Sequence, residues 1–480
     1  MADRLLTGVG GLDEILHGGL LRQRAYLVRG GPGSGKTTVG LHFLRQGVEA
    51  GEPTLFINQG EPEEEVRANA AAIGLDLTGV SFLDLTPSGT LFAEGQSYDV
   101  FHPAEVEREP TTQAIVDAVR QTRPTRVFLD VMTQLRYLSL DEVHFRRQAL
   151  TLLRFLVSSG ATVLFVSESQ DSDGDADLQF MSDGVVHMNN RGGLRTVMVS
   201  KFRGSAFAPG AHTLSIGADG MQVYPRLTPQ DHGKPFLAET ISSGVPEIDE
   251  LMAGGLERGT VTIITGPSGV GKTTLGLQFM KEAAGRGERS VVYTFEESAE
   301  VLAHRSQLVN IPIANMVATG KLSLVQVEPM RYTADQFGRL VREEVERADA
   351  RIVMIDSISG FAMCMREEKP ETYLHAVAKY LRNMGVTTIL INETTNITGD
   401  FRATDNAISY LADNIVYLRY IEIRGELRKV LGVLKKRLSD FEKTMREFEI
   451  TRYGVKVGAA LTNMRGILHG TPTLLETPPQ

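Results

Sequence analysis

The chain has little cysteine, no long apolar run and no excess of basic charge. Its one cysteine, Cys364, excludes a disulfide within the chain and fits a reducing compartment. No uncharged apolar stretch approaches the roughly 18 residues that a membrane span requires. With 50 Lys and Arg against 59 Asp and Glu, the formal net charge of -9 does not suit a surface built mainly to wrap nucleic acid. We therefore expect no membrane association and no general nucleic-acid binding.

A secretion signal is also missing. The first residues, MADRLLTGVGG, lack the charged start and the apolar run of such a signal. Cys364 lies in the apolar run GFAMCM, which is more typical of a buried, unreactive thiol than of a nucleophile. The apolar content of 42% and the mean hydropathy of -0.09 are those of a soluble globular protein. The sequence thus predicts a soluble, cytoplasmic protein.

The sequence does contain a duplication. TGVGGLDEILHGGL (7–20) aligns with SGVPEIDELMAGGL (243–256), and 480 residues are too many for one ordinary core. A polar stretch with proline, YPRLTPQDHGKP (224–235), is the natural joint between the copies. We predict a first domain at 1–225, a linker at 226–238, a second domain at 239–458, and a C-terminal loop and short tail at 459–480.

One stretch of the first copy has no counterpart in the second. It lies around 86–103, TPSGTLFAEGQSYDVFHP, where the Pro, Gly and Ser content predicts a surface excursion. Such an excursion is either a docking surface or a passive insertion.

Each copy alternates short apolar runs with segments of helical period. The runs in the first copy are AYLVRG, PTLFINQ, TRVFLDV and ATVLFVSES, and the helical segments include TTVGLHFLRQGVEA and FRRQALTLLRFLVSSG. This alternation predicts a mostly parallel sheet covered by helices on both faces. Each copy is therefore expected to be an α/β domain.

Both copies carry the phosphate-loop pattern G-x-x-x-x-G-K-[ST] between a predicted strand and a predicted helix. Its glycines let backbone N–H groups turn toward phosphate oxygens, its lysine reaches the β and γ phosphates, and its threonine hydroxyl binds Mg²⁺. The pattern predicts two sites for ATP and Mg²⁺. The residues expected to bind the nucleotide are Gly31, Gly33, Ser34, Gly35, Lys36, Thr37 and Thr38 in the first copy, and Ser268, Gly269, Val270, Gly271, Lys272, Thr273 and Thr274 in the second.

An aspartate ends the same apolar strand in each copy. Asp130 ends RVFLD and Asp356 ends RIVMID, the place where such domains hold Mg²⁺ through its water shell. With Thr37 and Thr273 these residues form the predicted metal sites. The alternative is that each aspartate only caps the next helix.

The glutamates after the next strand differ between the copies. The second copy reads YTFEES, with Glu296 and Glu297 adjacent, whereas the first reads INQGEP, with Gly60 before Glu61. At the carboxyl end of a strand, such a pair can polarise a nucleophile in line with the γ-phosphate. The alternative is a solvated loop. Base catalysis in the first copy is then expected to be weaker, to fall on Glu61, or to be lost.

At this point the chain resembles the KaiC family, a RecA-like group of clock ATPases with two fused copies. The resemblance covers nearly the whole chain and rests on GLDEILHGGL, IDELMAGGL, both phosphate loops, TFEES, SDGVVHM, KFRG, YIEIRGE, REFEIT and RGILHGTPT. It implies two tandem RecA-like P-loop NTPase domains, each a mostly parallel twisted sheet covered by helices. It also implies a double-ring homohexamer with ATP between neighbouring subunits, and it adds Glu296 to the metal site.

In rings of this family a Lys-x-Arg pair on a strand reaches the γ-phosphate held by the next subunit. Lys201 with Arg203 and Lys435 with Arg437 match this pair, and Lys443 is expected to add a contact. Without the resemblance, each pair would be interpreted as a solvated strand edge. Leu438 stands where the family usually has glycine.

The resemblance also implies an autokinase in the second ring, which phosphorylates a Ser-Thr pair on the neighbouring subunit through a carboxylate that Glu296 matches. The pair falls on Ser409 and Tyr410, with Thr404 and Asp405 nearby. The phenol oxygen of a tyrosine lies further from the backbone than a threonine hydroxyl, so Tyr410 is either an acceptor or an ordinary half-buried aromatic.

Three functions remain open from the sequence. The first is an ATP-hydrolysing hexamer with serine/threonine autokinase activity that acts in signalling or timing. The second is a RecA-type DNA-dependent ATPase, which the net charge disfavours, and the third is a scaffold assembled by nucleotide with little hydrolysis in the first ring. A KaiB-like or other signalling partner fits the first, whereas only LLETPPQ follows RGILHGTPT, which argues against a KaiA-type activator.

Overall fold

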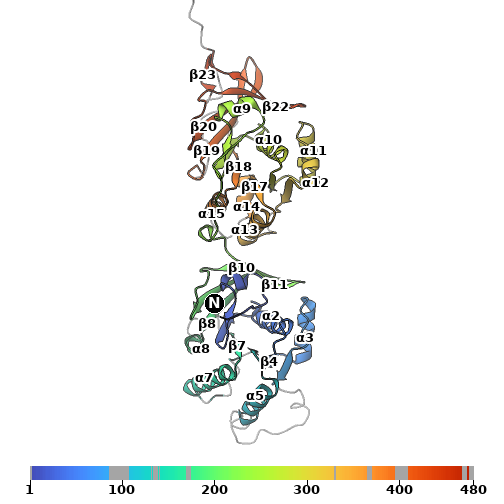
Figure 1. Ribbon diagram of the computed structural model, residues 1–480, viewed down its shortest axis with the longest axis vertical. Coiled ribbons are helices and arrows are strands. Elements are labelled where there is room, and N and C mark those ends of the chain that lie inside the picture. The colour runs from blue at the N-terminus through green and yellow to red at the C-terminus, as the bar shows by residue number, and fades with distance from the viewer. Residues whose placement is uncertain are drawn as a thin grey trace, which may run out of the picture. The chain divides into compact units, whose positions relative to one another are not determined.

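The structure is a computed structural model that describes residues 3–85, 108–130, 132, 139, 141–168, 175–328, 331–364, 370–394, 409–467 and 473–474. The chain divides into two compact units, Met1–Arg226 and Leu227–Gln480. Figure 1 shows in each unit a twisted sheet with helices packed against it. The predicted excursion at 86–103 lies outside the described residues.

The first unit alternates strands and helices, as the sequence predicts. Its helices are α1 (Leu12–Ile15), α2 (Lys36–Glu49), α3 (Glu63–Ala72), α5 (Arg108–Thr122), α7 (Glu142–Ser158) and α8 (Ala176–Met181). Its strands are β1 (Arg4–Leu5), β2 (Leu20–Leu21), β3 (Ala25–Gly30), β4 (Thr54–Asn58), β5 (Ser81–Asp84), β6 (Arg126–Asp130), β7 (Thr162–Ser167), β8 (Gly184–Arg191), β9 (Leu194–Phe202), β10 (His212–Gly217) and β11 (Gly220–Tyr224).

The second unit repeats this order. Its helices are η2 (Pro229–Asp231), α9 (Pro246–Leu251), α10 (Lys272–Gly285), α11 (Ala299–Gln307), α12 (Ile313–Ala318), α13 (Ala334–Arg342), η3 (Glu343–Arg347), α14 (Ile358–Cys364) and α15 (Pro370–Asn383). Its strands are β12 (Thr240–Ile241), β13 (Leu256–Glu257), β14 (Val261–Gly266), β15 (Arg289–Thr294), β16 (Leu322–Gln326), β17 (Ala350–Asp356), β18 (Thr387–Glu393), β19 (Asn414–Ile423), β20 (Glu426–Lys436), β21 (Arg446–Thr451), β22 (Gly454–Ala460), β23 (Met464–Arg465) and β24 (Thr473–Leu474).

In the part of the chain that the structure describes, each unit is built around a nine-stranded sheet. The order is β11-β10-β9-β8-β3-β7-β6-β4-β5 in the first unit and β22-β21-β20-β19-β14-β18-β17-β15-β16 in the second. Six strands of each sheet, from β8 to β5 and from β19 to β16, pair in parallel, and the other three are antiparallel. The predicted α/β fold with a mostly parallel sheet is confirmed.

The central strands are buried on both faces because helices cover both. In the first unit Val28 and Phe128 pack with Phe43 of α2, whereas Leu27 packs with Leu153 of α7 in a separate cluster. Neighbouring residues of a strand point to opposite faces, so an unbroken apolar run is what a doubly covered strand requires. This burial fixes the strand ends, from which the loops of the site emerge.

Two further features are visible in the second unit. Cys364 is 3% exposed, which confirms the expected buried thiol. The segment predicted as a linker packs against this unit: Leu227 joins its core, and the Asn383 side chain donates a hydrogen bond of 2.7 Å to the Pro229 carbonyl. Every helix in the described ranges is too short or too polar to span a bilayer.

The contact between the helix after each phosphate loop and the sheet depends on a glycine. A Cβ at Gly40 of α2 would lie 2.2 Å from the ring of Phe128, and one at Gly276 of α10 would lie 2.5 Å from the sulfur of Met354. The Phe128 ring is fixed in a packed core and cannot move away from an added methyl group, whereas the flexible end of the Met354 side chain can. The helix therefore lies close to the strand that ends in Asp130 or Asp356.

We predict that Gly40→Ala lowers the free energy of unfolding by about 1–3 kcal/mol, because the added methyl group overpacks Phe128. The matched control is Gly285→Ala at the exposed end of α10, where a Cβ would have no heavy atom within 4 Å. That variant should be neutral or stabilising by about 0.5–1 kcal/mol. Urea unfolding followed by circular dichroism measures both, and equal stability of Gly40→Ala and the native chain would contradict the packing argument.

Candidate active site

Each phosphate loop joins the central strand of its sheet to a long helix. Gly35 precedes α2 with φ +98°, and Gly271 precedes α10 with φ +115°, a left-handed conformation that only glycine adopts readily. A Cβ at these positions would also lie 2.8 Å from the Ile216 side chain or 2.6 Å from that of Ile450. Backbone and packing thus both require glycine, and the loop leaves the amino end of the helix free to face an anion.

The loop lysine of each copy lies inside its own loop. Lys36 Nζ donates to the Gly31 carbonyl at 3.0 Å, and Lys272 Nζ donates to the Pro267 carbonyl at 2.8 Å. Burial lowers the pKa of both ammonium groups, and nearby carboxylates oppose this effect: Glu168 and Asp130 at Lys36, and Glu393, Asp356 and Glu296 at Lys272. A bound triphosphate would provide the negative charge that a buried ammonium needs.

The predicted metal residues meet in both copies. Thr37 Oγ1 donates to Asp130 Oδ2 at 2.7 Å, and Thr273 Oγ1 donates to Asp356 Oδ2 at 2.8 Å. Burial raises the pKa of Asp130 to about 6 and also raises that of Asp356. A divalent cation beside such a carboxylate favours its ionised form, and the oxygen donors suit Mg²⁺.

The alternative role of the aspartate as a helix cap is not what the second copy shows. At the start of α14, the Gly360 N–H donates to Ser357 Oγ at 3.1 Å, so the capping oxygen belongs to the residue after Asp356. Asp356 remains turned toward Thr273 of the phosphate loop.

The glutamates of the two copies have different partners. Glu296 Oε1 accepts a hydrogen bond of 2.7 Å from Ser357 Oγ, and Glu297 forms an ion pair of 2.8 Å with Arg305. In the first copy Glu61 accepts a 3.2 Å hydrogen bond from the Asn69 amide, and Gly60 has no side chain.

These groups of the second copy surround one cavity of about 560 Å³. Its lining includes the phosphate loop, the Thr273 and Asp356 pair, both glutamates and Arg305, together with Glu393 from the end of β18. The predicted residues of this site, which lie far apart in the sequence, are therefore brought together by the carboxyl ends of β14, β15, β17 and β18.

The Lys-x-Arg pair of the second copy lies back from the carboxyl ends of the parallel strands, where the phosphate loop begins. Lys435 pairs with Ile415, and Ile415 pairs with Ile263, the third of the six residues of β14, whereas the phosphate loop follows the end of that strand. Ile263 lies three residues before Gly266, so the level of Lys435 is roughly 10 Å from the end of the strand at about 3.3 Å per residue. Arg437 follows Lys436, which pairs with Asn414 at the level of Thr262, so its backbone lies still further from the loop. Among the described residues that line the second cavity, neither Lys435 nor Arg437 occurs.

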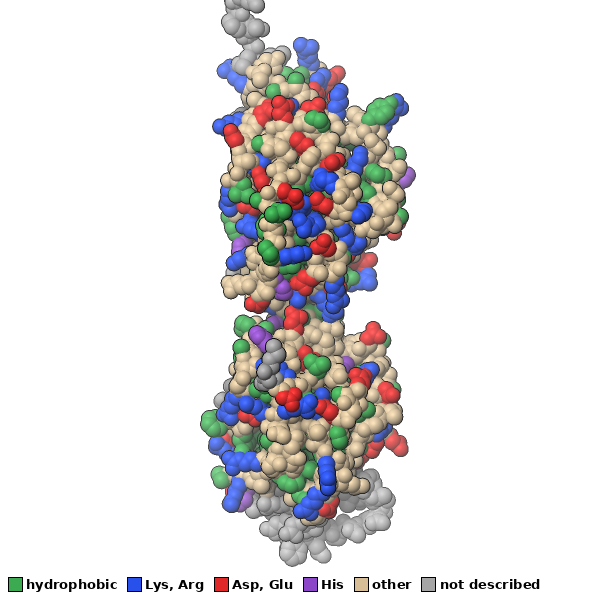
Figure 2. All heavy atoms as spheres, in the orientation of Figure 1, with side chains coloured by type: hydrophobic (Ala, Val, Ile, Leu, Met, Phe, Trp, Pro, Cys, Tyr) green, Lys and Arg blue, Asp and Glu red, His purple; other side chains and the backbone are tan. Residues whose placement is uncertain are grey.

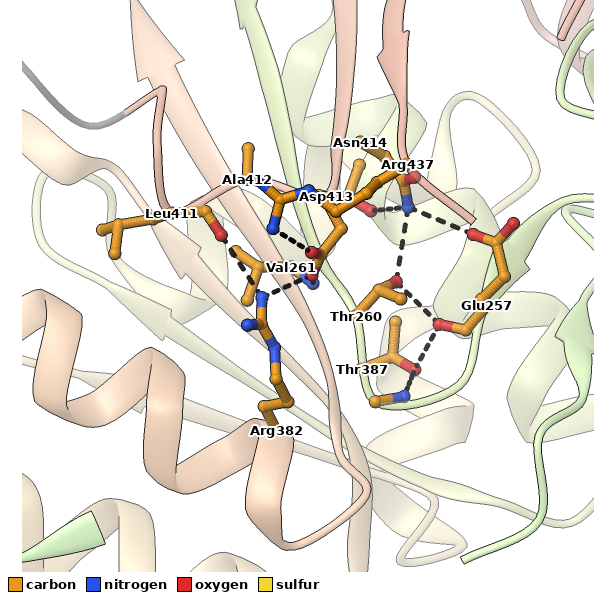
Figure 3. Close-up of polar contacts among 12 residues, drawn as sticks. Glu257, Thr260, Val261, Arg382, Thr387, Leu411, Ala412, Asp413, Asn414 and Arg437 are labelled. Atoms are coloured by element: carbon orange, nitrogen blue, oxygen red, sulfur yellow. Dashed lines mark hydrogen bonds and ion pairs between the residues drawn. The ribbon is translucent and has the colours of Figure 1, made fainter. Parts of the chain in front are cut away.

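In each copy, an aspartate contacts the arginine of the Lys-x-Arg pair. Figure 3 shows Arg437 and Arg382 both directed at the carboxylate of Asp413. The same carboxylate accepts a 3.0 Å hydrogen bond from the Val261 N–H at the start of β14. In the first copy Asp183 accepts from the Ala25 N–H at 3.1 Å and lies 3.9 Å from Arg203.

The lysine of each pair binds backbone carbonyls of the segment before the preceding strand, in α8 for Lys201 and in the turn before β19 for Lys435. Lys201 Nζ donates to the Gln179 carbonyl at 2.7 Å, and Lys435 Nζ donates to the Ser409 carbonyl at 3.2 Å and to the Ala412 carbonyl at 2.6 Å. The predicted phosphorylation site therefore lies directly beside Lys435.

The environment of that site is open. Ser409 and Tyr410 are both exposed, Tyr410 by 55%, and the Tyr410 ring lies 5.9 Å from the His375 ring, centroid to centroid. Tyr410 is thus somewhat more exposed than the half-buried aromatic that is the alternative to an acceptor. Thr404 and Asp405 lie outside the described residues. Lys443 is exposed in the loop between β20 and β21, and Leu438 is exposed after Arg437.

Several residues of the site are not recognised from the sequence. Glu168 follows the last residue of β7 and Glu393 is the last residue of the equivalent strand β18, and this repetition is a signal in the sequence. Asp413 repeats Asp183, and each lies just before an equivalent strand, β8 or β19, which is the same kind of signal. For Ser357, the only indication in the sequence is that it directly follows Asp356. Arg305 lies eight residues after its partner Glu297, and the sequence does not indicate that the two side chains meet.

Comparison with known proteins places this geometry in a family. The family model described as "ATPase: KaiC" matches residues 5–228 and 241–462. The circadian clock oscillator protein KaiC of Acaryochloris marina is 28% identical over 98% of this chain and 91% of its own length. Circadian clock oscillator protein KaiC of Prochlorococcus marinus is 29% identical over 98% and 95%, and KaiC 1 of Synechocystis is 29% identical over 98% and 92%. Two phosphate loops on duplicated α/β units and a match over both units lead to one conclusion: the chain belongs to the KaiC family of ATPases.

Proposed function

We propose that the chain is a cytoplasmic, Mg²⁺-dependent ATPase that works as a homohexameric double ring and transfers phosphate to its own second copy. The observation that carries this proposal is the second cavity, where Lys272, the Thr273 and Asp356 pair and Glu296 surround one space. Lys272 would bind the β and γ phosphates, the Thr and Asp oxygens would hold Mg²⁺, and Glu296 would accept the proton of the nucleophile. Bound Mg²⁺ would neutralise charge on the phosphates.

The ring is supported by the separation of the two halves of the site. Lys435 and Arg437 lie three or more residues back along β14 from the phosphate loop of their own unit, and neither is among the described residues that line its cavity. A neighbouring copy can bring its pair to that loop, where the positive charge would stabilise the transferring phosphoryl group. Ring closure by such head-to-tail contacts gives each site one loop and one pair.

Phosphate transfer to Ser409 is supported by its place beside Lys435. If Lys435 reaches the γ-phosphate of the next subunit, the exposed Ser409 hydroxyl approaches the same phosphate. Tyr410 is the second candidate acceptor, and its ring lies next to His375. A product with phosphate on Ser409 would give partner proteins a state to recognise, as a signalling or timing enzyme requires.

Gly60 favours a second candidate function, in which the first ring binds nucleotide mainly to assemble. The first copy keeps Lys36, Thr37 and Asp130 for binding but has a single glutamate, Glu61, near the base position. A DNA-dependent motor has no comparable support. On the face that Figure 2 shows, Lys and Arg side chains are interspersed with Asp and Glu rather than gathered into a basic stripe.

We predict that Glu296→Gln lowers hydrolysis by the second copy about 10²-fold or more, because the amide cannot accept the proton. ATP-dependent assembly should persist, since Lys272 and Thr273 are unchanged. Phosphate release and size-exclusion chromatography with Mg²⁺ and ATP measure the two properties. Glu61→Gln measured in parallel separates the candidates: unchanged total turnover would favour the first ring as a scaffold. Added double-stranded DNA should not raise turnover.

A second prediction concerns where the arginine acts. In a Glu61→Gln background, Arg437→Ala chains and Glu296→Gln chains should each be nearly inactive, and a mixture of the two should regain turnover. Each Arg437→Ala chain keeps its own Glu296 and receives an intact Arg437 from its neighbour. A mixture no more active than its components, with mixed rings confirmed by native mass spectrometry, would mean that the arginine does not act across subunits.

A third prediction is that incubation with Mg²⁺ and ATP adds phosphate to Ser409. Intact mass and peptide mapping should show one added phosphate that Ser409→Ala removes and Tyr410→Phe leaves in place. Phosphate only on Tyr410 would assign the transfer to the phenol. No added mass in a chain that hydrolyses ATP would leave an ATPase without autokinase activity.

A further inference from the structure

The two adjacent glutamates of the second cavity are held by different partners. Glu296 is exposed and bound by the Ser357 hydroxyl at 2.7 Å. Glu297 Oε2 accepts from both Nε and a terminal nitrogen of Arg305, at 2.9 and 2.8 Å. The backbone of Glu297 is fixed as well, because its carbonyl accepts a 2.7 Å hydrogen bond from Thr294 Oγ1. The carboxylate pair is therefore separated by its contacts.

The first copy has neither the second carboxylate nor the guanidinium. Asn69 of α3 aligns with Arg305 of α11, and it binds Glu61 through a neutral amide at 3.2 Å. Relative to the first copy, the second has one more carboxylate, Glu296 in place of Gly60, and one more cation, Arg305 in place of Asn69. The two sets of aligned residues thus carry the same formal charge, although their chemistry differs.

We infer that Arg305 is a positioning residue that holds Glu297 at the rim of the cavity, so that Glu296 alone of the pair acts on the nucleophile. This inference rests on the proposed function and deepens it. The adjacent glutamates do not share one role: Glu296 is the base and Glu297 is the anchor of α11. It also explains why one copy has two carboxylates where the other has one, because the second carboxylate comes with its own cation.

The surroundings explain why such a cation is needed. The cavity already holds Asp356 and Glu393 against one buried cation, Lys272, and it must accept a triphosphate. Without Arg305, Glu297 would be free to turn inward, where its charge would repel the phosphates and compete for Mg²⁺. Arg305 also acts on Asp356: burial raises the pKa of Asp356, and the Arg305 charge opposes that rise. The Arg305 side chain is 39% exposed, so solvent screens its charge and weakens its effect on the pKa of Asp356.

The test uses the full-length chain with Glu61→Gln, so that turnover reports the second copy. Arg305→Asn, which places the first copy's residue here, should lower kcat about tenfold and leave KM for ATP within about twofold, because orientation and not nucleotide binding is lost. Arg305→Lys should recover part of kcat, since it keeps the charge but not the two-nitrogen contact. Arg331→Asn, at an exposed arginine outside the cavity lining, is the matched control and should not change kcat.

A double variant separates positioning from a structural effect. If Arg305 acts by holding the charge of Glu297, then Glu297→Gln should raise kcat of the Arg305→Asn chain several-fold, and the two effects should not add. A double variant as slow as Arg305→Asn or slower would overturn the inference. A rise in KM with kcat unchanged would also overturn it, and would make Arg305 a phosphate ligand.

Failure of the inference and failure of the proposed function give different results. If the Glu61→Gln chain has no turnover that Glu296→Gln abolishes, the second copy is not the ATPase proposed above. If that turnover is present and Arg305→Asn leaves kcat unchanged, the function stands and the role of Arg305 is wrong.

Discussion

One buried strand, β14, separates the phosphate loop of the second copy from its Lys435 and Arg437 pair. β14 carries the phosphate loop at its carboxyl end, and the Lys435 and Arg437 pair lies level with its amino-terminal half. The strand is fully buried and covered on both faces, so the separation cannot be closed by local motion. The first unit repeats the arrangement with β3 and Lys201. Under the proposed function, a site with both a loop and a cationic pair would be completed by another copy.

The two copies share a binding scaffold and differ in the groups that act on it. The Thr37 and Asp130 pair has nearly the same geometry as the Thr273 and Asp356 pair. The differences lie one strand further along, where the second copy has Glu296 and the first has Gly60. The phosphate-loop lysine and the Thr and Asp pair are thus repeated in both copies, whereas the residues at the end of the next strand differ.

The sequence was sufficient for whatever depends on contiguous residues. The strands from AYLVRG to ATVLFVSES, the phosphate loops and Asp130 and Asp356 at strand ends are all local patterns, and the structure has them where they were expected. Pairing between distant segments is different. The contact of Ser357 with Glu296, 61 residues apart, depends on how α14 packs at the sheet edge, and no spacing in the sequence encodes it. The contact of Arg305 with Glu297 spans only eight residues, but it depends on the turn that leads from Glu297 into α11.

Asp413 has a consequence for how neighbouring sites would communicate. Its carboxylate binds the first N–H of β14 and, at the same time, Arg437. β14 thus carries the predicted nucleotide site at its carboxyl end and is linked to Arg437 through Asp413 at its amino end. In the proposed ring, a shift of β14 along its axis when nucleotide binds would displace that cation by the same amount. Occupancy of one pocket would then be transmitted mechanically to the next, around the whole circle.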